Sequence, residues 1–381
     1  MAYDFWSYFD MIGDVKRTDA YVRALQAAIR PGDSVVEIGT GNGYFAIIAA
    51  KLGAAEVVAI EPNDMIDVAR EFACANGVGD SIRFIEAMST AVELPKKADV
   101  MVSDLRGILP FFQAHIPSIT DARERLLATG GRQIPERDEI YAACVSSERI
   151  FSHYGLATEI GAEVTVLDPL YRRLRSIWTK QRVKPEECIT QPFHIATLDY
   201  RTLTDSRLRA EVSWRVPEDR TAHGMCVWFD AKLFGDVGYS NAPTHEKGLI
   251  YGQAFFPFLE PIELRADETV TVTFDGALVR GSYVWQWNTT VRSADDTARI
   301  ALRQNTLEGI VTGSEKRRRR AGDHRPEVNR TIELTRFVLE RVDGERSLEA
   351  MAREVSEAFP DTFESWSDAL TFVGEAIEKN R

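Results

Sequence analysis

The feature that most constrains the fold is an alternation of short apolar runs with amphipathic stretches between residues 33 and 145. The apolar runs, typical of buried strands, are Val35–Ile38, Val57–Ile60, Ile82–Ile85 and Val100–Val102. Tyr44–Leu52 and Met65–Asn76, which lie between them, have helical periodicity. Strands that alternate with helices at this spacing predict a doubly wound parallel sheet of the Rossmann-like α/β class. Ligands of such sheets bind at the carboxyl ends of the strands.

The pattern changes after about residue 145. Strand-like stretches then follow one another without a long helix, at Phe193–Leu198, Leu208–Trp214, Met225–Leu233, Val270–Phe274 and Tyr283–Val291. Repeated short strands of this kind predict an antiparallel β-barrel, with a β-sandwich as the alternative arrangement.

The chain is therefore expected to have five parts. Residues 1–30 form a helical lead-in that is expected to cover the ligand edge of the sheet, 31–145 the Rossmann-like domain and 146–313 the barrel. Residues 314–326 are charged and predict a linker, whose basic block at 316–320 either is solvated or binds an anionic partner. Residues 327–381 have three amphipathic segments and predict a small helical domain.

Composition excludes several classes of protein. With 44% hydrophobic and 27% charged residues the chain is globular, and its net charge of −12 argues against a general nucleic-acid binder. No apolar run is long enough for a membrane span, and the N-terminal residues do not resemble a secretory signal. The four cysteines are far apart and predict neither a metal site nor disulfides, so we expect a cytoplasmic protein.

A glycine-rich loop follows the first predicted strand. It runs from Glu37 to Gly43, and Gly39 and Gly41 allow the backbone to turn tightly and approach a ligand. Glu61 ends the next predicted strand, where a carboxylate can accept hydrogen bonds from both ribose hydroxyls. The GxGxG spacing favours S-adenosyl-L-methionine (SAM) over NAD, and a purely structural turn is the alternative.

Six segments resemble the protein arginine methyltransferase family in their order and spacing. They include MIGDVKRT with the following Tyr21, VVEIGTGNGYFAIIAAKLGA and VVAIEPND, and they lie at residues 11–21, 35–54, 57–64, 91–95, 103–107 and 126–145. The resemblance covers roughly residues 3–300. It implies a SAM-binding domain that leads into a β-barrel.

The resemblance also implies roles in cofactor binding. Arg17 would pair with the SAM carboxylate, because a guanidinium makes paired, charge-assisted hydrogen bonds. Gly39 would face the methionine part and Glu61 the ribose. The other expected cofactor residues include Glu37, Gly41 and Tyr8, and the family often has His at the position of Tyr8. Ser89 and Thr90 would contact the adenine, and the family has Glu at the position of Thr90.

The acceptor loop departs from the family. Asp104 and Gln113 stand where the family has two glutamates that hold a guanidinium, and Arg106 replaces Met. Arg106 would repel a cationic substrate or bind an acidic one, so these changes disfavour arginine as the acceptor. Asp104, Gln113 and Arg106 are the expected catalytic residues, with Asp104 orienting an N–H or O–H nucleophile and taking its proton, or merely shaping the loop.

Other predicted contacts are less specific. The Thr-His-Trp loop of the family is replaced by residues 249–253, where Tyr251 and Gln253 remain possible polar contacts. His115 is either near the pocket or a structural histidine.

The segment 338–360 resembles small PqqD-like winged-helix modules. In that group a helix, a DG turn and a capped helix capture a leader peptide, which implies a ribosomally made peptide substrate that adds a strand to the module. A structural or oligomer-contacting tail is the alternative.

The segment 168–180 lies where the family projects its dimerisation arm. Leu170, Leu174, Ile177 and Trp178 form an apolar face at helical spacing, which predicts a homodimer or, alternatively, a helix packed in the core.

Together these features predict a SAM-dependent methyltransferase that acts on a peptide or protein side chain. Two other functions remain open. One is methylation of a small molecule such as free arginine or a natural-product intermediate, and the other is a non-catalytic SAM-binding scaffold.

Overall fold

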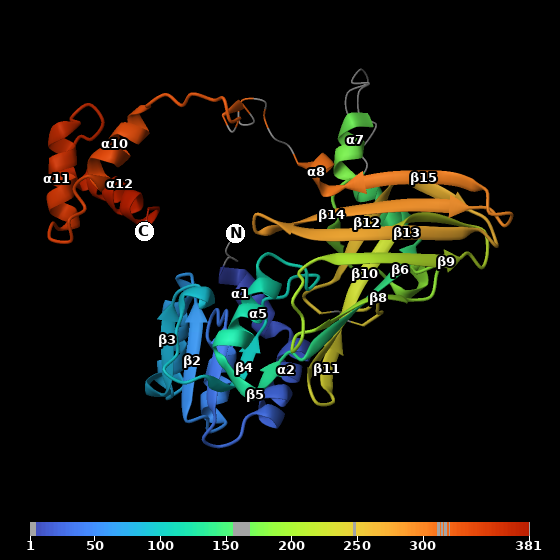
Figure 1. Cartoon of the computed structure of the whole chain (residues 1–381), viewed down its shortest axis with the longest axis horizontal. Coiled ribbons are helices and arrows are strands. Elements are labelled where there is room, and N and C mark those ends of the chain that lie inside the picture. The colour runs from blue at the N-terminus through green and yellow to red at the C-terminus, as the bar shows by residue number, and fades with distance from the viewer. Residues whose placement is uncertain are drawn as a thin grey trace. The chain divides into compact units, whose positions relative to one another are not determined.

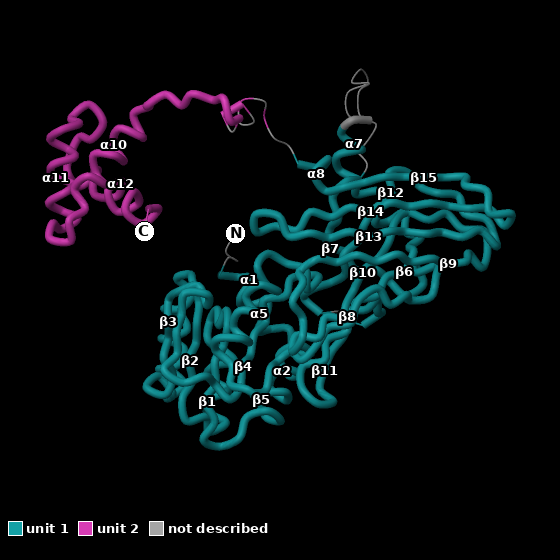
Figure 2. The backbone as a smooth tube through the Cα atoms, viewed as in Figure 1, with its two compact units in different colours: residues 1–310 teal, residues 311–381 magenta. Residues whose placement is uncertain are grey.

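The chain folds into two compact units. The computed structural model describes residues 5–154, 168–246, 249–310, 313, 315, 318–319 and 321–380. Unit 1 is Met1–Ile310 and unit 2 is Val311–Arg381 (Figure 2). The main apolar core and a smaller cluster lie in unit 1, and a separate apolar cluster lies in unit 2.

Unit 1 begins with a parallel sheet in the strand order β3-β2-β1-β4-β5. The strands are β1 (Ser34–Ile38), β2 (Glu56–Glu61), β3 (Ile82–Glu86), β4 (Ala98–Ser103) and β5 (Leu127–Ile134). The connecting elements are α3 (Tyr44–Lys51), α4 (Met65–Ala75), η1 (Gly79–Ser81), η2 (Ser89–Ala91) and α5 (His115–Arg125). Because β1 pairs with both β2 and β4, the order reverses at β1, and a ligand crevice is expected beside its carboxyl end.

Two helices precede the sheet, α1 (Phe5–Gly13) and α2 (Val15–Ala28). The carboxylate of Asp14 caps α2 by accepting a hydrogen bond from the backbone N–H of Arg17. It also accepts one from the backbone N–H of Ile250 at 2.6 Å. Helix α2 contacts β5 on one side and β10 and β11 on the other (Figure 1). Arg17 and Tyr21 lie on its buried face.

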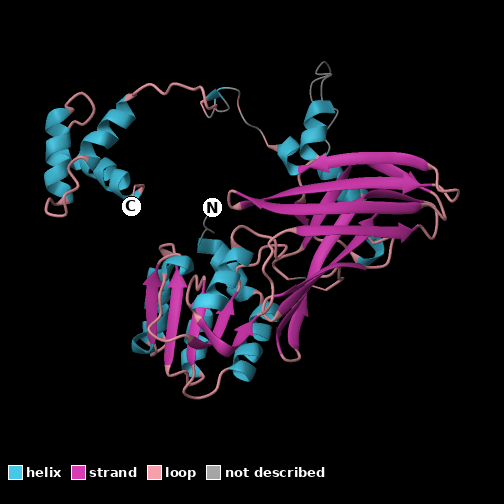
Figure 3. Ribbon diagram, viewed as in Figure 1, coloured by secondary structure: helices cyan, strands magenta, loops and turns pink. Residues whose placement is uncertain are grey.

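The second half of unit 1 contains two antiparallel sheets (Figure 3). One has the order β7-β12-β10-β6-β8, with β11 paired to β10, and the other β15-β14-β13-β9. The strands are β6 (Arg137–Val145), β7 (Thr179–Gln181), β8 (Phe193–Asp199), β9 (Leu208–Arg215), β10 (Arg220–Phe234), β11 (Val237–Ser240), β12 (Gln253–Leu264), β13 (Thr269–Val279), β14 (Ser282–Arg292) and β15 (Ala298–Asn305).

Aromatic rings join these two sheets. Phe256 of β12 lies 5.3–5.5 Å, between ring centroids, from Phe274, Trp285 and Trp287 of the other sheet. No strand pairing joins the sheets within the described residues, so the predicted barrel is present as two ladders packed together and is not closed.

Short helices complete unit 1: α6 (Glu148–Phe151), η3 (Ser152–Tyr154), α7 (Asp168–Leu174), η4 (Pro185–Glu187) and α8 (Thr306–Gly309). In the predicted arm, Leu170, Leu174 and Ile177 are exposed. Trp178 instead stacks on Phe256 in the core. The apolar face of the arm therefore has three members at the surface rather than four.

Unit 2 contains α10 (Arg330–Leu339), α11 (Leu348–Ala358) and α12 (Trp366–Glu378). The side chains of Asn329, Ser347 and Ser365 cap the three helices. Residues 321–380 form helices, turns and loops but no strand, so they offer no strand edge for the peptide capture that the PqqD-like resemblance implies. Much of the basic block, residues 316, 317 and 320, lies outside the described residues.

No helix within the described residues is long and apolar enough to cross a membrane.

Candidate functional site

A cavity of about 420 Å³ opens at the carboxyl ends of β1, β2 and β4. Residues of α1 and α2, the glycine-rich loop and the start of α5 complete its walls. Its position is the one that the strand order predicts, and its volume lies in the range of small-molecule sites.

The glycine-rich loop shapes the cavity floor. Gly39 and Gly41 have φ angles of 71° and 54°, which non-glycine residues rarely adopt. A Cβ atom on Gly41 would lie 2.6 Å from the Tyr8 ring, and one on Gly39 would lie 2.3 Å from the Leu105 side chain. Glycine is therefore required for both conformation and space, and Tyr8 and Leu105 close over the loop.

Glu61 anchors the loop from the end of β2. Its Oε2 accepts a hydrogen bond from Gly41 N at 2.9 Å, and its Oε1 accepts one from Asn63 Nδ2 at 2.6 Å. Burial raises the pKa of this carboxyl, although these hydrogen bonds oppose the change. Each oxygen retains acceptor capacity toward the cavity, which fits a pair of ribose hydroxyls.

Glu37 is the more deeply buried acid of the loop. Burial raises its pKa to about 8, although the hydrogen bond from Thr40 Oγ1 opposes the shift. Glu37 therefore carries a proton at neutral pH and adds no charge to the cavity.

Arg17 reaches the cavity from α2. Its Nε donates to Asp104 Oδ2 at 2.6 Å, its Nη2 lies 2.5 Å from the same oxygen, and its Nη1 donates to Met11 O at 3.0 Å. A guanidinium has five N–H donors. Each terminal nitrogen thus keeps a second N–H for which the described part of the chain offers no partner. These two donors suit a ligand carboxylate.

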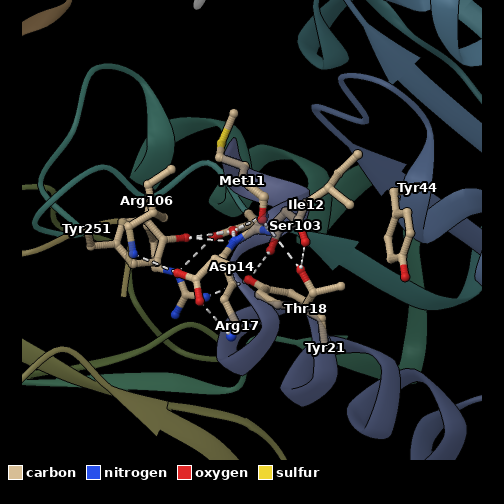
Figure 4. A network of polar contacts seen from close by, with 12 residues as sticks. Met11, Ile12, Asp14, Arg17, Thr18, Tyr21, Tyr44, Ser103, Arg106 and Tyr251 are labelled. Atoms are coloured by element: carbon tan, nitrogen blue, oxygen red, sulfur yellow. Dashed lines mark hydrogen bonds and ion pairs between the residues drawn. The ribbon is translucent and has the colours of Figure 1, made fainter. Parts of the chain in front are cut away.

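Asp104, at the end of β4, lies between two guanidinium groups. Arg106 Nε donates to its Oδ1 at 3.3 Å, and the Tyr251 hydroxyl donates to its Oδ2 at 2.7 Å. Figure 4 shows Arg17, Arg106 and Tyr251 within this network of polar contacts. Burial alone would raise the pKa of Asp104, but the charges of Arg17 and Arg106 outweigh burial and hold that pKa below its ordinary value. Asp104 is therefore ionised and already paired.

Arg106 turns away from solvent into the protein. Its side chain is fully buried, with Nη1 donating to Asp138 Oδ1 at 2.7 Å and Nη2 to the hydroxyls of Tyr21 and Tyr239. Arg106 is thus not available to bind an acidic substrate, in contrast to one of the sequence expectations.

Gln113 and His115 also line the cavity, where α5 begins. Gln113 is exposed and has a φ of 43°. His115 is 2% exposed, and burial, together with the Arg106 charge, lowers its pKa to about 3. His115 is therefore neutral, and its Nε2 lies 3.0 Å from the Tyr200 hydroxyl.

The cavity brings together most of the residues that the sequence predicts. They are Tyr8, Arg17, Glu37, Gly39, Gly41, Glu61, Ser89, Asp104, Arg106 and Gln113. Thr90 is not among the residues that line it: η2 buries Ser89 and leaves Thr90 exposed, because successive residues of a 3₁₀ turn point in different directions.

Three polar residues of the second domain were not predicted as part of the site. Asp138 is the second residue of β6, Tyr239 lies on β11, and Tyr200 follows β8. No local pattern marks them, because they reach the site only when the antiparallel domain packs on α2. A buried Arg106 would require an acidic partner, but the sequence does not indicate which acidic residue takes that position.

Two family models match the chain. One describes ribosomal protein L11 methyltransferase and matches residues 12–133. The other describes an oligomerisation domain of a protein arginine methyltransferase, PRMT5, and matches residues 169–313.

Relatives match over a longer span. Protein arginine N-methyltransferase PRMT10 of Oryza sativa subsp. japonica is 30% identical over 317 residues, which cover 71% of this chain and 83% of the relative. An arginine N(omega)-methyltransferase of Streptomyces achromogenes is 25% identical, over 70% of this chain and 74% of the relative.

Solved structures share the fold. The crystal structure of Arabidopsis thaliana protein arginine methyltransferase 10 has a TM-score of 0.69 at 21% identity, over 80% of this chain and 98% of that one. A Trypanosoma brucei PRMT1 enzyme-prozyme heterotetramer with AdoHcy has a TM-score of 0.70 at 17% identity, over 79% and 98%.

The protonation of Glu37 predicts a pH-dependent stability. The unfolded chain releases this proton near its ordinary pKa of 4.5, whereas the folded chain keeps it until about pH 8. The unfolded state therefore binds fewer protons in that window, and Glu37 lowers the free energy of unfolding as pH rises, by at most about 1.4 kcal/mol per pH unit. Glu37→Gln should abolish this component between pH 5 and 8 in urea titrations of the ligand-free protein.

Glu86, exposed at the end of β3, provides the control: Glu86→Gln makes the same substitution without removing a buried carboxylate, so the component due to Glu37 should remain. A constant offset between wild type and Glu37→Gln across the window would show that Glu37 is ionised in the folded chain.

Proposed function

The chain belongs to the protein arginine methyltransferase family, and on that premise we propose that it transfers a methyl group from SAM to a side chain of a peptide or protein. Family membership makes it a SAM-dependent methyltransferase. The observation that carries the proposal is the cavity in which Arg17, Glu61 and the glycine-rich loop converge.

The polar groups of this cavity fit the cofactor. All three residues line the cavity: Glu61 would accept the ribose hydroxyls, Arg17 would hold the amino-acid carboxylate, and Ser89 would contact the adenine. Tyr8 covers the loop beside Gly41 and would exclude water from the cofactor. When bound, SAM supplies a methyl group already activated by a sulfonium, so this chain's main task is alignment of the nucleophile.

Asp104 would orient the acceptor from the end of β4. Its two arginines and Tyr251 fix the carboxylate, so its position is preorganised. Arg106 would be a positioning residue for Asp104. Gln113, on the exposed rim, would contact the acceptor where it enters.

A small molecule is the second candidate substrate. The Streptomyces relative is named for arginine itself, with no protein in its name. The four cysteines are unpaired, which supports a cytoplasmic location in either case, and cell fractionation tests this.

Residues 327–381 would recruit the peptide. Their helices have a buried cluster of their own, and a tethered binding module raises the local concentration of its ligand. We expect a chain of residues 1–326 to lose at least tenfold in methyl transfer from labelled SAM to a degenerate peptide pool, and to keep its turnover of free amino acids within twofold. S-adenosylhomocysteine binding reports that unit 1 is folded. Equal peptide turnover by the full chain and by residues 1–326 would show that residues 327–381 do not recruit the peptide.

Arg17 offers a direct test of the cofactor site. Loss of a charge-assisted pair costs roughly 1.5–3 kcal/mol, so Arg17→Ala should weaken S-adenosylhomocysteine binding by about 10–100-fold in calorimetry. Methylthioadenosine lacks the amino-acid carboxylate and should bind wild type and variant alike.

Arg23 on the exposed face of α2 is the matched control, since Arg23→Ala should change neither affinity. If Arg17→Ala weakened both ligands equally, Arg17 would have only a structural role.

We also propose a homodimer that forms through the arm at residues 168–180. Leu170, Leu174 and Ile177 are exposed there, and the match to an oligomerisation domain begins at residue 169. Leu170→Asp should convert the dimer to a monomer in sedimentation velocity, because burying an unpaired carboxylate opposes association. Val279→Asp, at an equally exposed position of β13, should leave the mass unchanged. A wild-type monomer, or a dimer that survives Leu170→Asp, would contradict this assignment.

A further inference from the structure

A second cavity, of about 300 Å³, lies in the antiparallel half of unit 1 and is lined mainly by basic and polar side chains. Arg149 belongs to α6, Arg182 and Lys184 follow β7, and Thr244 and His245 follow β11. The whole chain has a net charge of −12, so this group of cations departs from its composition. None of these residues lines the cavity at the parallel sheet, so the basic cavity is a separate candidate binding site.

Two of the lining cations have no ionic partner. Neither the Arg182 guanidinium nor the Lys184 ammonium donates a hydrogen bond to, or forms an ion pair with, another described residue. Arg149 Nη1 also lacks a partner in the described part of the chain, although the other nitrogens of that guanidinium are engaged. Three groups of N–H donors are therefore available for a ligand at this cavity.

The acid closest in the sequence is already used by the fold. Glu187 Oε2 accepts hydrogen bonds from Lys184 N at 2.8 Å and from Arg149 Nη2 at 2.9 Å. Its Oε1 accepts one from Ser147 Oγ at 2.7 Å. Burial would raise the pKa of Glu187, but these hydrogen bonds outweigh burial and hold that pKa below its ordinary value. Glu187 is therefore ionised and balances Arg149.

Two further acids near the cavity are paired as well. Glu246 forms an ion pair with Lys16 of α2. Glu186 Oε2 lies 3.3 Å from Nε2 of His245. No carboxylate among the described residues lines the cavity, so its two unpaired cations are not balanced there.

Hydrogen bonds fix the walls of the basic cavity to one another. The buried Gln253 accepts from Val183 N at 2.9 Å and donates to Asn241 O at 2.6 Å, which joins the segments after β7 and β11. Arg149 Nη2 donates to Arg182 O at 2.8 Å and adds α6 to this assembly. A ligand would therefore meet a backbone that is already in place, which lowers the entropic cost of binding.

We propose that the basic cavity binds a phosphate monoester, held by Arg182, Lys184 and the remaining N–H groups of Arg149. A guanidinium and an ammonium both form strong, charge-assisted hydrogen bonds to phosphate oxygens. Thr244 Oγ1 accepts from Glu246 N at 3.2 Å, and its hydroxyl hydrogen can be donated to the ligand. The volume is at the lower end of small-molecule sites, which leaves room for the group that carries the phosphate. This site does not depend on the proposed methyl transfer.

Calorimetry on the full chain at constant ionic strength tests the ligand class. The probes are glycerol 3-phosphate, a blocked phosphoserine peptide and inorganic phosphate, with glycerol and the unphosphorylated peptide as controls. We expect one of the two monoesters to bind about tenfold or more tighter than inorganic phosphate, and the controls not to bind. The tighter monoester identifies the source of the phosphate as a free metabolite or a protein side chain.

Two double variants locate the site. Arg182→Gln with Lys184→Gln removes the unpaired cations and should weaken monoester binding about tenfold or more. Lys96→Gln with Lys97→Gln removes the same charge at exposed positions before β4 and should leave the affinity unchanged. An unchanged melting temperature of each variant reports that the fold is retained.

Three outcomes would overturn the inference. Equal losses of affinity in the two double variants would reduce the interaction to a general attraction of charge. Inorganic phosphate that binds as tightly as both monoesters would exclude a site built for the ester. Absence of binding by every phosphate probe would remove the site, and the proposed methyl transfer would stand in each case.

Discussion

The site depends on one buried set of ion pairs centred on Asp104. Arg17 comes from α2, Asp104 and Arg106 follow β4, and Asp138 lies on β6. These pairs tie the lead-in helix, the parallel sheet and the antiparallel domain to one another at the cavity. Because each charge is buried, removing any one would leave its partner unmatched, a far larger penalty than the pair's net contribution to stability. The geometry of the cavity is therefore coupled to the packing of the two domains.

This coupling holds the polar side chains of the cavity in fixed positions. Arg17 is fixed by Asp104, Tyr251 and Met11 O, and still has donors for a ligand. A methyltransferase gains most of its rate from alignment, which requires groups that do not reorganise during the reaction.

The sequence predicts the parallel sheet and its ligand edge well. The periodicity of apolar residues, the spacing of the strands and the turns that require glycine are all local properties of the chain. The Gly39–Gly41 loop and Glu61 are examples, since turn geometry and strand ends fix their places. The Asp138–Arg106 pair could not be predicted, since its partners are distant in sequence and meet only through domain packing. The absence of Thr90 from the cavity wall has a local reason, namely the direction of one side chain in a short turn.

The replacement at Arg106 has a consequence that fold similarity does not reveal. Solved relatives with 17–21% identity share the architecture, so the fold tolerates wide changes in sequence. A fold does not determine the substrate, which depends on the charges placed at the site. Here an added arginine is neutralised by Asp138 rather than by a ligand, and Asp104 is shared between two cations. The four buried charges of Arg17, Asp104, Arg106 and Asp138 therefore balance one another within the protein.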